Sequence, residues 1–365
     1  MERDKALYVD ANSQFAVRPA GTHEPADNEL LIEVQYSGIN PADVKHATHL
    51  GIVDTVLGYD FCGCVVRTPP KGSGKFSVGD TVAGYTPTSM GRSPRHGTHQ
   101  PFLCCPEDMC FAVPEAALPR PHAAALTTVA MTAADAIYNL FGTPLPTAAP
   151  SSSPPSTPKP LLIWGAASSV GLCALQFAAA SQLWFPILAT ASPSRHALLR
   201  RLGATAAFDY RSPSVVQDIR SAVAASGLPL AHALDAVGAA AGPVAQCADD
   251  PDDPEKTVLV SATFQPDARF RLPLALQHRP FHIRLPGPEA REIVVPPKPE
   301  PHWRAWEALR WAVGNYRAEG EAEGGFRLPE VRVERVGAEE ALELVKGVAE
   351  GRTGFGKVVI EHRIE

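Results

Sequence analysis

The sequence has no long hydrophobic run. No uninterrupted apolar stretch approaches the roughly 20 residues that a membrane-spanning helix needs. The first residues, Met1–Lys5, are mostly charged and no apolar segment follows them, so we expect no secretory leader. A strong charge of one sign is also missing, because 33 basic and 39 acidic residues leave a net charge of −6. These absences argue against a membrane protein or a nucleic-acid-binding protein and favour a cytoplasmic one.

Cysteine is scarce, and its spacing excludes the usual cysteine-rich sites. The seven cysteines are odd in number and follow no disulfide-framework pattern, so we interpret them as reduced thiols of a cytosolic protein. Cys104, Cys105 and Cys110 lie close together, yet they do not make a four-cysteine zinc site. Buried or incidental thiols are the simpler interpretation.

Proline, in contrast, is abundant, at 36 of 365 residues. Many prolines cluster with serine in residues 144–160, a composition that cannot hold a helix or a strand and predicts an exposed loop or linker. An acidic stretch at 248–256 and a proline-rich stretch at 286–301 are also irregular. The sequence predicts no role for residues 248–256.

The hydrophobic pattern predicts an α/β protein. Residues 1–130 are mostly β in pattern and end in a helical pattern that runs over 122–141. Strands and helices alternate strictly over 161–261, which predicts a parallel sheet. The tail is mixed, with helices expected at 303–318 and 338–350. We therefore expect a doubly wound nucleotide domain, residues 131–295, inserted into a β-rich domain made of residues 1–130 and 296–365.

The strongest local signal is a strand that runs through small residues directly into a helix. The apolar strand 161–164 is followed by Gly165-Ala166-Ala167-Ser168-Ser169-Val170-Gly171 and then by the apolar run 172–180. This pattern is typical of a dinucleotide site, where a pyrophosphate lies on the helix N-terminus. Of the three fingerprint glycines only the last, Gly171, is in place, so an ordinary strand–helix turn remains the alternative.

The second strand of this region indicates which dinucleotide is bound. An acid about 20 residues after the glycine turn would hold a free ribose 2′-hydroxyl. Here the strand 187–191 runs instead into Ser192-Pro193-Ser194-Arg195-His196, without a carboxylate. Hydroxyl groups and an arginine suit a 2′-phosphate, so the sequence predicts NADPH. Tyr210 is expected to pack on the adenine or reach a phosphate, or else to be a core residue.

Several phrases of the sequence resemble those of a known superfamily. They are Gly38–Asp43, Gly58–Gly63, Val78–Val82, Gly165–Gly171 and Gly354–Val359, and together they resemble the medium-chain dehydrogenase/reductase superfamily over essentially the whole chain. The resemblance implies a Rossmann nucleotide domain inserted in a GroES-like catalytic domain. Zinc-dependent members place a cysteine at Asn40 and Gly-His-Glu at residues 58–60. Because both are missing, the chain resembles the zinc-free quinone-oxidoreductase branch, and no metal is expected.

Within that branch, the chain looks most like the trans-acting enoyl reductases of fungal polyketide synthases. The features are Lys45, the insertion before Gly165, Ser192-Pro193, and residues 208–211 (Phe-Asp-Tyr-Arg). The resemblance implies an NADPH-dependent reductase of an α,β-unsaturated thioester. It also implies a partner, a polyketide synthase or synthase–peptide synthetase hybrid that carries the substrate on its acyl carrier protein. Alternatives are a stand-alone NADPH quinone or alkenal reductase and a catalytically silent NADPH-binding scaffold. Chain length and the partner synthase stay undetermined.

The motif and the resemblance together nominate the site residues. Lys45 is expected to anchor the cofactor or relay a proton, although a surface lysine is the alternative. Thr132 is expected to face cofactor or substrate, although a threonine can bond within its own helix. Lys45 and Thr132 are the catalytic candidates, and the cofactor-binding candidates are Asn40, Asp43, Val44, Lys45, Thr128, Ser168, Ser169, Val170, Gly171, Ser192, Ser194, Arg195, Tyr210, Ala262, Thr263, Gly354 and Phe355.

Two further expectations concern assembly. An acidic carrier protein would need a local basic patch on this net-negative chain, and two sets of residues are candidates: Arg92, Arg95 and His96, and Arg269, Arg271, Arg279 and Arg284. Solvated loop charges are the alternative for both sets. Prolines 266, 273 and 280 with Arg269 and Arg271 oppose strand pairing after Ser261, so we expect a monomer. Residues 277–288 are expected to line the acyl pocket.

Overall fold

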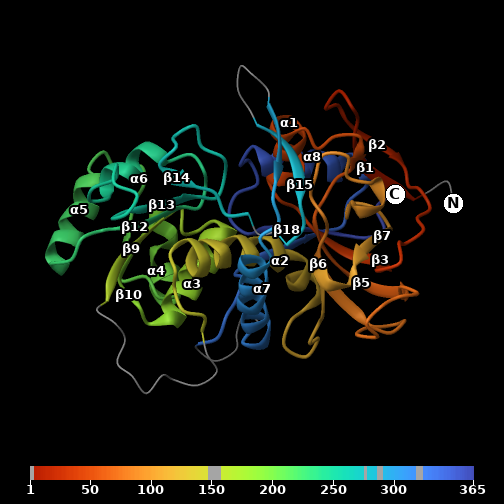
Figure 1. The fold of residues 1–365 in the computed structure, drawn as a ribbon, viewed down its shortest axis with the longest axis horizontal. Coiled ribbons are helices and arrows are strands. Elements are labelled where there is room, and N and C mark those ends of the chain that lie inside the picture. The colour runs from red at the N-terminus through yellow and green to blue at the C-terminus, as the bar shows by residue number, and fades with distance from the viewer. Residues whose placement is uncertain (1–3, 147–157, 275–277, 286–290, 318–323) are drawn as a thin grey trace. The chain divides into compact units, whose positions relative to one another are not determined.

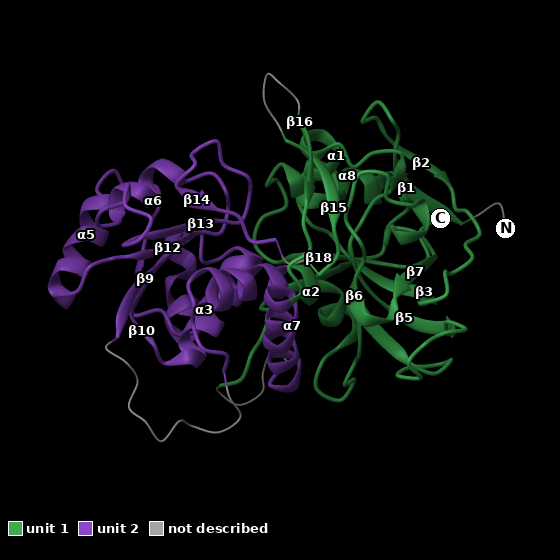
Figure 2. Ribbon diagram, in the orientation of Figure 1, with its two compact units in different colours: residues 1–128, 276–299, 316–365 green, residues 129–275, 300–315 purple. Residues whose placement is uncertain are grey.

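The computed structural model describes residues 4–146, 158–274, 278–285, 291–317 and 324–365. The chain divides into two compact units, shown in Figure 2. Unit 1 comprises residues 1–128, 276–299 and 316–365, and unit 2 comprises residues 129–275 and 300–315. No helix of the described residues combines the length and the apolar character that a bilayer crossing requires.

Unit 2 is built on a six-stranded sheet whose strands are all parallel. In spatial order the strands are β11 (Ala206–Phe208), β10 (Trp184–Thr190), β9 (Lys159–Trp164), β12 (His232–Asp235), β13 (Val258–Ser261) and β14 (Phe270–Arg271). By order of appearance in the chain this is the arrangement 3-2-1-4-5-6 of dinucleotide-binding domains. The strand order reverses between β9 and β12, and ligands of such sheets bind at the carboxyl ends of the strands there.

Helices cover both faces of this sheet (Figure 1). They are α3 (Ser169–Ser181), α4 (His196–Arg201), α5 (Val215–Ser226), α6 (Ala241–Cys247) and α7 (Pro299–Gly314), together with the 3-10 turn η4 (Pro193–Arg195) and the π-helical segment η3 (Asp135–Leu140). Helices α5 and α6 share one apolar cluster with strands β9, β10, β12 and β13. On the other face, Phe177 of α3 packs against Tyr138 of η3 and Trp311 of α7.

Unit 1 consists mainly of antiparallel β-structure. Its largest sheet contains β17 (Val331–Glu334), β18 (Lys357–Glu361), β3 (Glu29–Gly38), β5 (Asp60–Arg67), β6 (Thr81–Tyr85) and β8 (Cys110–Ala112) in that order, and β7 (Phe102–Pro106) pairs with β3. A smaller sheet contains β2 (Phe15–Pro19), β1 (Lys5–Val9) and β4 (Thr55–Val56), and a separate hairpin contains β15 (Phe281–Leu285) and β16 (Arg291–Val295). Helices α1 (Ala42–Leu50) and α8 (Ala338–Ala349) pack together. The structure also contains helix α2 (Arg120–Ala134) and the 3-10 turns η1 (Pro94–His96) and η2 (Glu107–Met109).

Helix α1 has clear local signals at both ends. Pro41 precedes it, and the Asp43 carboxylate accepts a hydrogen bond from the Asn40 N–H at 2.8 Å. The helix ends at Gly51, whose φ of 71° is the left-handed conformation that glycine adopts without strain. Ala47 on its inner face joins a core cluster with Leu342 and Val345 of α8. These signals fix the position of Lys45 in the middle of the helix.

The α/β architecture expected from the sequence is confirmed. The division into units follows other bounds than residues 130/131 and 295/296, because the β15–β16 hairpin belongs to unit 1 and residues 300–315 to unit 2. Hydrogen bonds explain both differences. The Met90 N–H donates to the His282 carbonyl inside unit 1, and the Asn139 side chain donates to the Pro301 carbonyl inside unit 2.

Three expected elements differ in detail. The helical pattern over 122–141 gives an α-helix only to Ala134, after which η3 continues as a π-helix. Within η3 the Asp135 carboxylate accepts from the Leu274 N–H, a long-range contact that no local pattern encodes. Helix α7 begins at Pro299, not at residue 303, because proline is well tolerated in a first helical turn. Most of the proline–serine insertion, residues 147–157, lies outside the described residues.

Candidate functional site

Two glycines shape the turn that follows β9 in unit 2. Gly165 has a φ of +73°, and a Cβ there would lie 2.5 Å from Val237 Cγ1. A Cβ on Gly171 would lie 2.5 Å from the Gly165 carbonyl oxygen and 2.7 Å from Ala166 Cα. Only glycine therefore lets α3 pack this closely on the turn. Gly165 therefore makes the tight turn, a role that the fingerprint spacing assigns to Ala166. The position of Gly165 directly after the strand was the feature of the sequence that indicated this role.

The first turn of α3 has the geometry that the expected anion site requires. The Ser168 Oγ accepts from the Gly171 N–H at 3.1 Å and caps the helix. The N–H groups of Ser169 and Val170 have no acceptor within the helix, because the preceding turn is absent. They point along the positive end of a 13-residue helix dipole. The Ser168 hydroxyl also approaches the Ala236 carbonyl at 3.4 Å, so this turn lies where β9 and β12 diverge. The residues present therefore fit a pyrophosphate.

The ends of β10 and β11 lie side by side. Thr190 is in register with Phe208, and the Ala191 N–H donates to the Phe208 carbonyl at 3.0 Å. Just beyond, Ser192 accepts a hydrogen bond at its Oγ from Arg211 Nη1 at 2.9 Å. No carboxylate occupies residues 190–196, as the sequence already indicated. Sequence reasoning missed Arg211, although the strand end that carries Tyr210 also carries it.

Of the other residues predicted here, Tyr210 is 40% exposed at the end of β11. The Arg211 guanidinium lies 4.4 Å from the centroid of its ring. Ser194 and Arg195 lie in the turn η4, where the Arg195 N–H donates to the Ser192 carbonyl at 2.9 Å. The structure thus brings Ser192, Tyr210 and Arg211 together in one cluster.

The ends of β12 and β13 contribute a second part of this edge. Asp235 is fully buried, and its carboxylate accepts from the N–H groups of Val237, Gly238 and Ala240 at 2.8–3.1 Å. Ala262 follows β13, and its N–H donates to the Asp235 carbonyl. The Thr263 hydroxyl donates to the Gly238 carbonyl at 3.3 Å. Ala262 and Thr263 therefore lie at the carboxyl edge, and Val237 and Phe264, each 42% exposed, add an apolar surface that the sequence did not predict.

Unit 1 contains a buried polar cluster around Asp60. Asn40 is only 3% exposed, and its Nδ2 donates to Asp60 Oδ2 at 2.9 Å. The Lys357 ammonium donates to Asn40 Oδ1 and lies 3.6 Å from Asp60 Oδ2. The N–H and the hydroxyl of Thr128 both donate to Asp60 Oδ1. Burial raises the pKa of Asp60, and Lys357, Thr128 and Asn40 oppose that rise. Both ends of the Asn40 amide are therefore engaged inside the unit.

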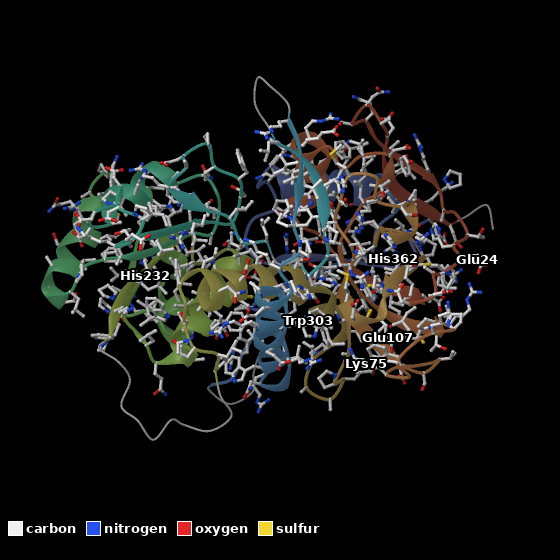
Figure 3. The ribbon with its side chains drawn as sticks, in the orientation of Figure 1. Glu24, Lys75, Glu107, His232, Trp303 and His362 are labelled. Carbon is white, nitrogen blue, oxygen red and sulfur yellow. The ribbon has the colours of Figure 1, made fainter. Side chains whose placement is uncertain are left out.

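Asp43 belongs to a second buried chain of hydrogen bonds. Its Oδ2 is 3.2 Å from His99 Nε2, and His99 Nδ1 is 2.8 Å from the Ser37 hydroxyl. His362, which follows β18 and is labelled in Figure 3, lies 2.8 Å from the same hydroxyl. Burial lowers the pKa of His362 to about 3, so this histidine is neutral at physiological pH. Asp43 is 2% exposed and acts within the structure as the partner of Asn40 and His99.

The remaining predicted residues of unit 1 lie on α1 and before β18. Val44 packs on the core cluster beneath α1, and Lys45 is half-buried on the same helix. Gly354, with a φ of +76°, and Phe355 lie in the loop that leads into Lys357. Because Val359 is paired with Gly38, this loop and Asn40 come to the same edge of the sheet. Thr132 lies on the part of α2 that belongs to unit 2.

The residues expected to dock a carrier protein have partners within the structure. Arg92 is buried and donates to the carbonyls of Val56 and Gly58. Arg95 and His96 both contact Glu29, at 3.0 and 2.7 Å. In the second set, three arginines pair with carboxylates and Arg271 donates to the Pro254 carbonyl: Arg269 with Asp252 and Asp267, Arg279 with Asp108, and Arg284 with Glu292. Most of these side chains are thus engaged inside the structure, and the docking expectations stay predictions.

Metal ligation has no obvious location. In the part of the chain that the structure describes, no group of three or more His, Cys, Asp or Glu side chains is arranged to hold a metal ion. Cys104 and Cys105 are buried, and burial raises the pKa of Cys104 to about 12. The expectation that the protein contains no metal stays a prediction.

Comparisons with known proteins agree with this fold. Residues 26–115 match the alcohol dehydrogenase GroES-like domain. The chain is 34% identical over 219 residues to the trans-enoyl reductase himH of Aspergillus japonicus, a match covering 58% of this chain and 59% of that protein. It is 32% identical over 240 residues to the trans-enoyl reductase tazE of Aspergillus terreus, covering 63% of this chain and 75% of that protein.

Two solved structures are similar over nearly the whole chain. An alcohol dehydrogenase superfamily protein from Novosphingobium aromaticivorans has a TM-score of 0.68 at 21% identity, with 99% of this chain and 100% of that one covered. The CurK enoyl reductase has a TM-score of 0.67 at 19% identity, with 98% and 99% covered. At these identities the likeness concerns the fold alone.

Proposed function

The chain belongs to the medium-chain dehydrogenase/reductase superfamily, among its enoyl reductases, and from this premise we propose that it is an NADPH-dependent, trans-acting enoyl reductase. Its substrate is an α,β-unsaturated polyketide thioester held on the acyl carrier protein of a synthase or synthase–peptide synthetase hybrid. The relatives that carry the name trans-enoyl reductase support the reaction class.

One observation carries the choice of cofactor. The end of β10 presents Ser192, with Arg211 bonded to it, where an NAD-binding sheet would place a carboxylate. A carboxylate there would repel a 2′-phosphate, whereas a hydroxyl and a guanidinium attract one. Together with the capped N-terminus of α3, this supports NADPH.

The chemistry needs little from the protein beyond positioning and electrostatics. When bound, NADPH supplies a hydride to the β-carbon of the substrate. The N–H groups of Ser169 and Val170 would hold the pyrophosphate, and Ser192 would hold the ribose end. We assign Lys45 and Thr132 to the reacting end, as donors that orient the cofactor or the thioester oxygen, whose negative charge grows during the reaction. A proton then reaches the α-carbon, and the saturated thioester results.

Isotope labelling tests the reaction. With NADPH deuterated at the transferred position and an enoyl-pantetheine thioester, the label should appear only at the β-carbon, and solvent deuterium only at the α-carbon. Mass spectrometry and NMR of the product locate both. Deuterium on a carbonyl carbon would mean that the enzyme reduces ketones or aldehydes instead.

The alternative functions have distinct outcomes in the same assay. Rapid turnover of quinones without turnover of enoyl-pantetheine would identify a quinone reductase. No loss of absorbance at ~340 nm, the absorption of reduced nicotinamide, with any activated alkene, despite NADPH binding, would identify a silent scaffold. Neither alternative has a specific observation in its favour, so the enoyl reductase remains our conclusion.

A further inference from the structure

Arg211 lies at the carboxyl end of β11, beside the end of β10 in the unit 2 sheet. The pairing of Thr190 with Phe208 makes the loops after these two strands leave the sheet together. The Arg211 N–H donates to Asp209 Oδ1 at 3.1 Å, which holds the backbone of the second loop in a turn. The Arg211 side chain then reaches across to Ser192, whose Oγ it contacts at 2.9 Å.

The charge of Arg211 is not neutralised within the described chain. No carboxylate of the described residues forms an ion pair with its exposed side chain, in contrast to Arg269 and Arg279, which are each held by aspartates. Its other contact is the face of the Tyr210 ring, 4.4 Å from the guanidinium carbon to the ring centroid. Stacking on an aromatic face orients a guanidinium and leaves its edge donors available.

Ser192 adds a second donor to the same place. Because its oxygen accepts from Arg211, its own hydroxyl proton is directed elsewhere. An arginine edge and a serine hydroxyl that converge in this way suit a phosphate monoester, which accepts several charge-assisted hydrogen bonds. Arg195, the arginine that the sequence nominated, belongs to the turn η4, where its backbone N–H donates to the Ser192 carbonyl.

We propose that Arg211, and not Arg195, is the residue that selects the 2′-phosphorylated cofactor, with Ser192 as its companion donor and Tyr210 as the surface that orients it. The inference rests on the proposed function in taking NADPH as the cofactor. It assigns the preference for the phosphate to one guanidinium.

Equilibrium binding to the full chain tests this without any turnover. The probes are adenosine 2′,5′-bisphosphate and 5′-AMP, which differ only in the 2′-phosphate, and calorimetry gives both dissociation constants. Arg211→Gln should weaken binding of the bisphosphate about 10- to 100-fold, as expected for loss of a charge-assisted phosphate contact, and leave 5′-AMP within about twofold. Arg211→Lys should fall between wild type and Arg211→Gln, because it keeps the charge and loses the planar fork.

Two variants serve as controls. Arg195→Gln removes the competing candidate, and Arg201→Gln removes an exposed positive charge from α4 of the same unit. Neither should change the bisphosphate affinity by more than about twofold. An unchanged affinity in Arg211→Gln, or a selective loss in Arg195→Gln, overturns the inference and leaves the proposed function standing. A wild-type protein that binds both probes equally overturns the choice of NADPH as well.

Discussion

Lys357 is a charged side chain that the fold buries almost completely. It is 5% exposed and contacts Asn40 and Asp60. Removing an ammonium and a carboxylate from water is costly, and the pair is tolerated because hydrogen bonds from Asn40 and Thr128 satisfy the carboxylate. The cluster therefore depends on every member.

Replacing Lys357 by methionine should destabilise the protein strongly. The change leaves Asp60 as a buried charge without its counter-ion, which typically costs about 3–5 kcal/mol of the free energy of unfolding. Urea denaturation measures the loss. The double variant Lys357→Met, Asp60→Asn should recover part of it, because no net charge then remains.

The matched control is Lys346→Met on α8, where the lysine makes an exposed pair with Glu343 at 2.8 Å. It should change stability little, because exposed ion pairs are screened by water. If Lys357→Met proved as mild as Lys346→Met, the buried pair would not matter for stability.

Contacts of the candidate site were predictable where the two residues lie close together in the sequence, and not where they lie far apart. Gly171 and Ser168 lie three positions apart within one turn, and the missing acid after β10 is visible in the sequence itself. The contact of Lys357 with Asn40 joins residues 317 positions apart, and the contact of Arg211 with Ser192 joins residues 19 apart that follow two neighbouring strands. Only the folded sheet shows such pairs.

At the scale of elements, Glu29 connects the start of β3 to the turn η1. Its carboxylate accepts from Arg95 and contacts His96. Burial alone would raise the pKa of Glu29, but hydrogen bonds from His96 and the Ala26 N–H, with the charges of His96 and Arg95, outweigh it and lower the pKa to about 2. Burial lowers the pKa of His96 itself, and its contact with Glu29 opposes that change.

This arrangement predicts a pH-dependent stability. A carboxylate whose folded pKa is below its unfolded value of 4.5 stabilises the fold fully above that pH and less as the pH falls toward 2. Glu29→Gln should therefore lower the free energy of unfolding by roughly 2–3 kcal/mol at pH 7, and the difference from wild type should shrink between pH 4.5 and pH 3. Urea denaturation at several pH values measures it.

Glu24→Gln is the control, since Glu24 is 85% exposed in its pair with Arg67 and is labelled in Figure 3. The free energy of unfolding of Glu24→Gln should differ little from that of the wild type at every pH. If the free energies of unfolding of Glu29→Gln and wild type differed by a constant amount down to pH 3, the lowered pKa of Glu29 would be contradicted.

The elements themselves were predicted better than their ends. The alternation of strands and helices over 161–261 was visible because buried parallel strands are continuous apolar runs. The π-helical end of the 122–141 segment was not, because it depends on Asp135 binding the Leu274 N–H. The β15–β16 hairpin was also missed, and β15 lies within the stretch expected to line the acyl pocket. Residues 277 and 286–288 of that stretch lie outside the described residues.

At the scale of the whole molecule, the outer strand β14 bears on assembly. It consists of only two residues, Phe270 and Arg271, and pairs in parallel with β13. Arg269 beside it is bound to Asp252 and Asp267. A short, charged edge strand flanked by prolines pairs poorly with the edge strand of a second copy.

We expect a monomer on these grounds. Sedimentation equilibrium should give a mass close to 38.9 kDa at micromolar concentration. The value should not rise when NADPH is added, because the cofactor contacts proposed above are on another edge of the sheet. A mass near twice that value would contradict the expected monomer and the argument from β14.

The order in which the chain supplies its strands has a consequence for synthesis on the ribosome. Residues 129–275 deliver all six strands of the unit 2 sheet in one continuous stretch. Unit 1 is different, because Tyr36, Ser37 and Gly38 find their partners in β18, more than 300 residues later. Until those residues emerge, the nascent chain holds a finished nucleotide unit beside a sheet with an open edge, the kind of surface that invites aggregation. The unit that begins first is thus completed last, and the few residues of β18 close it.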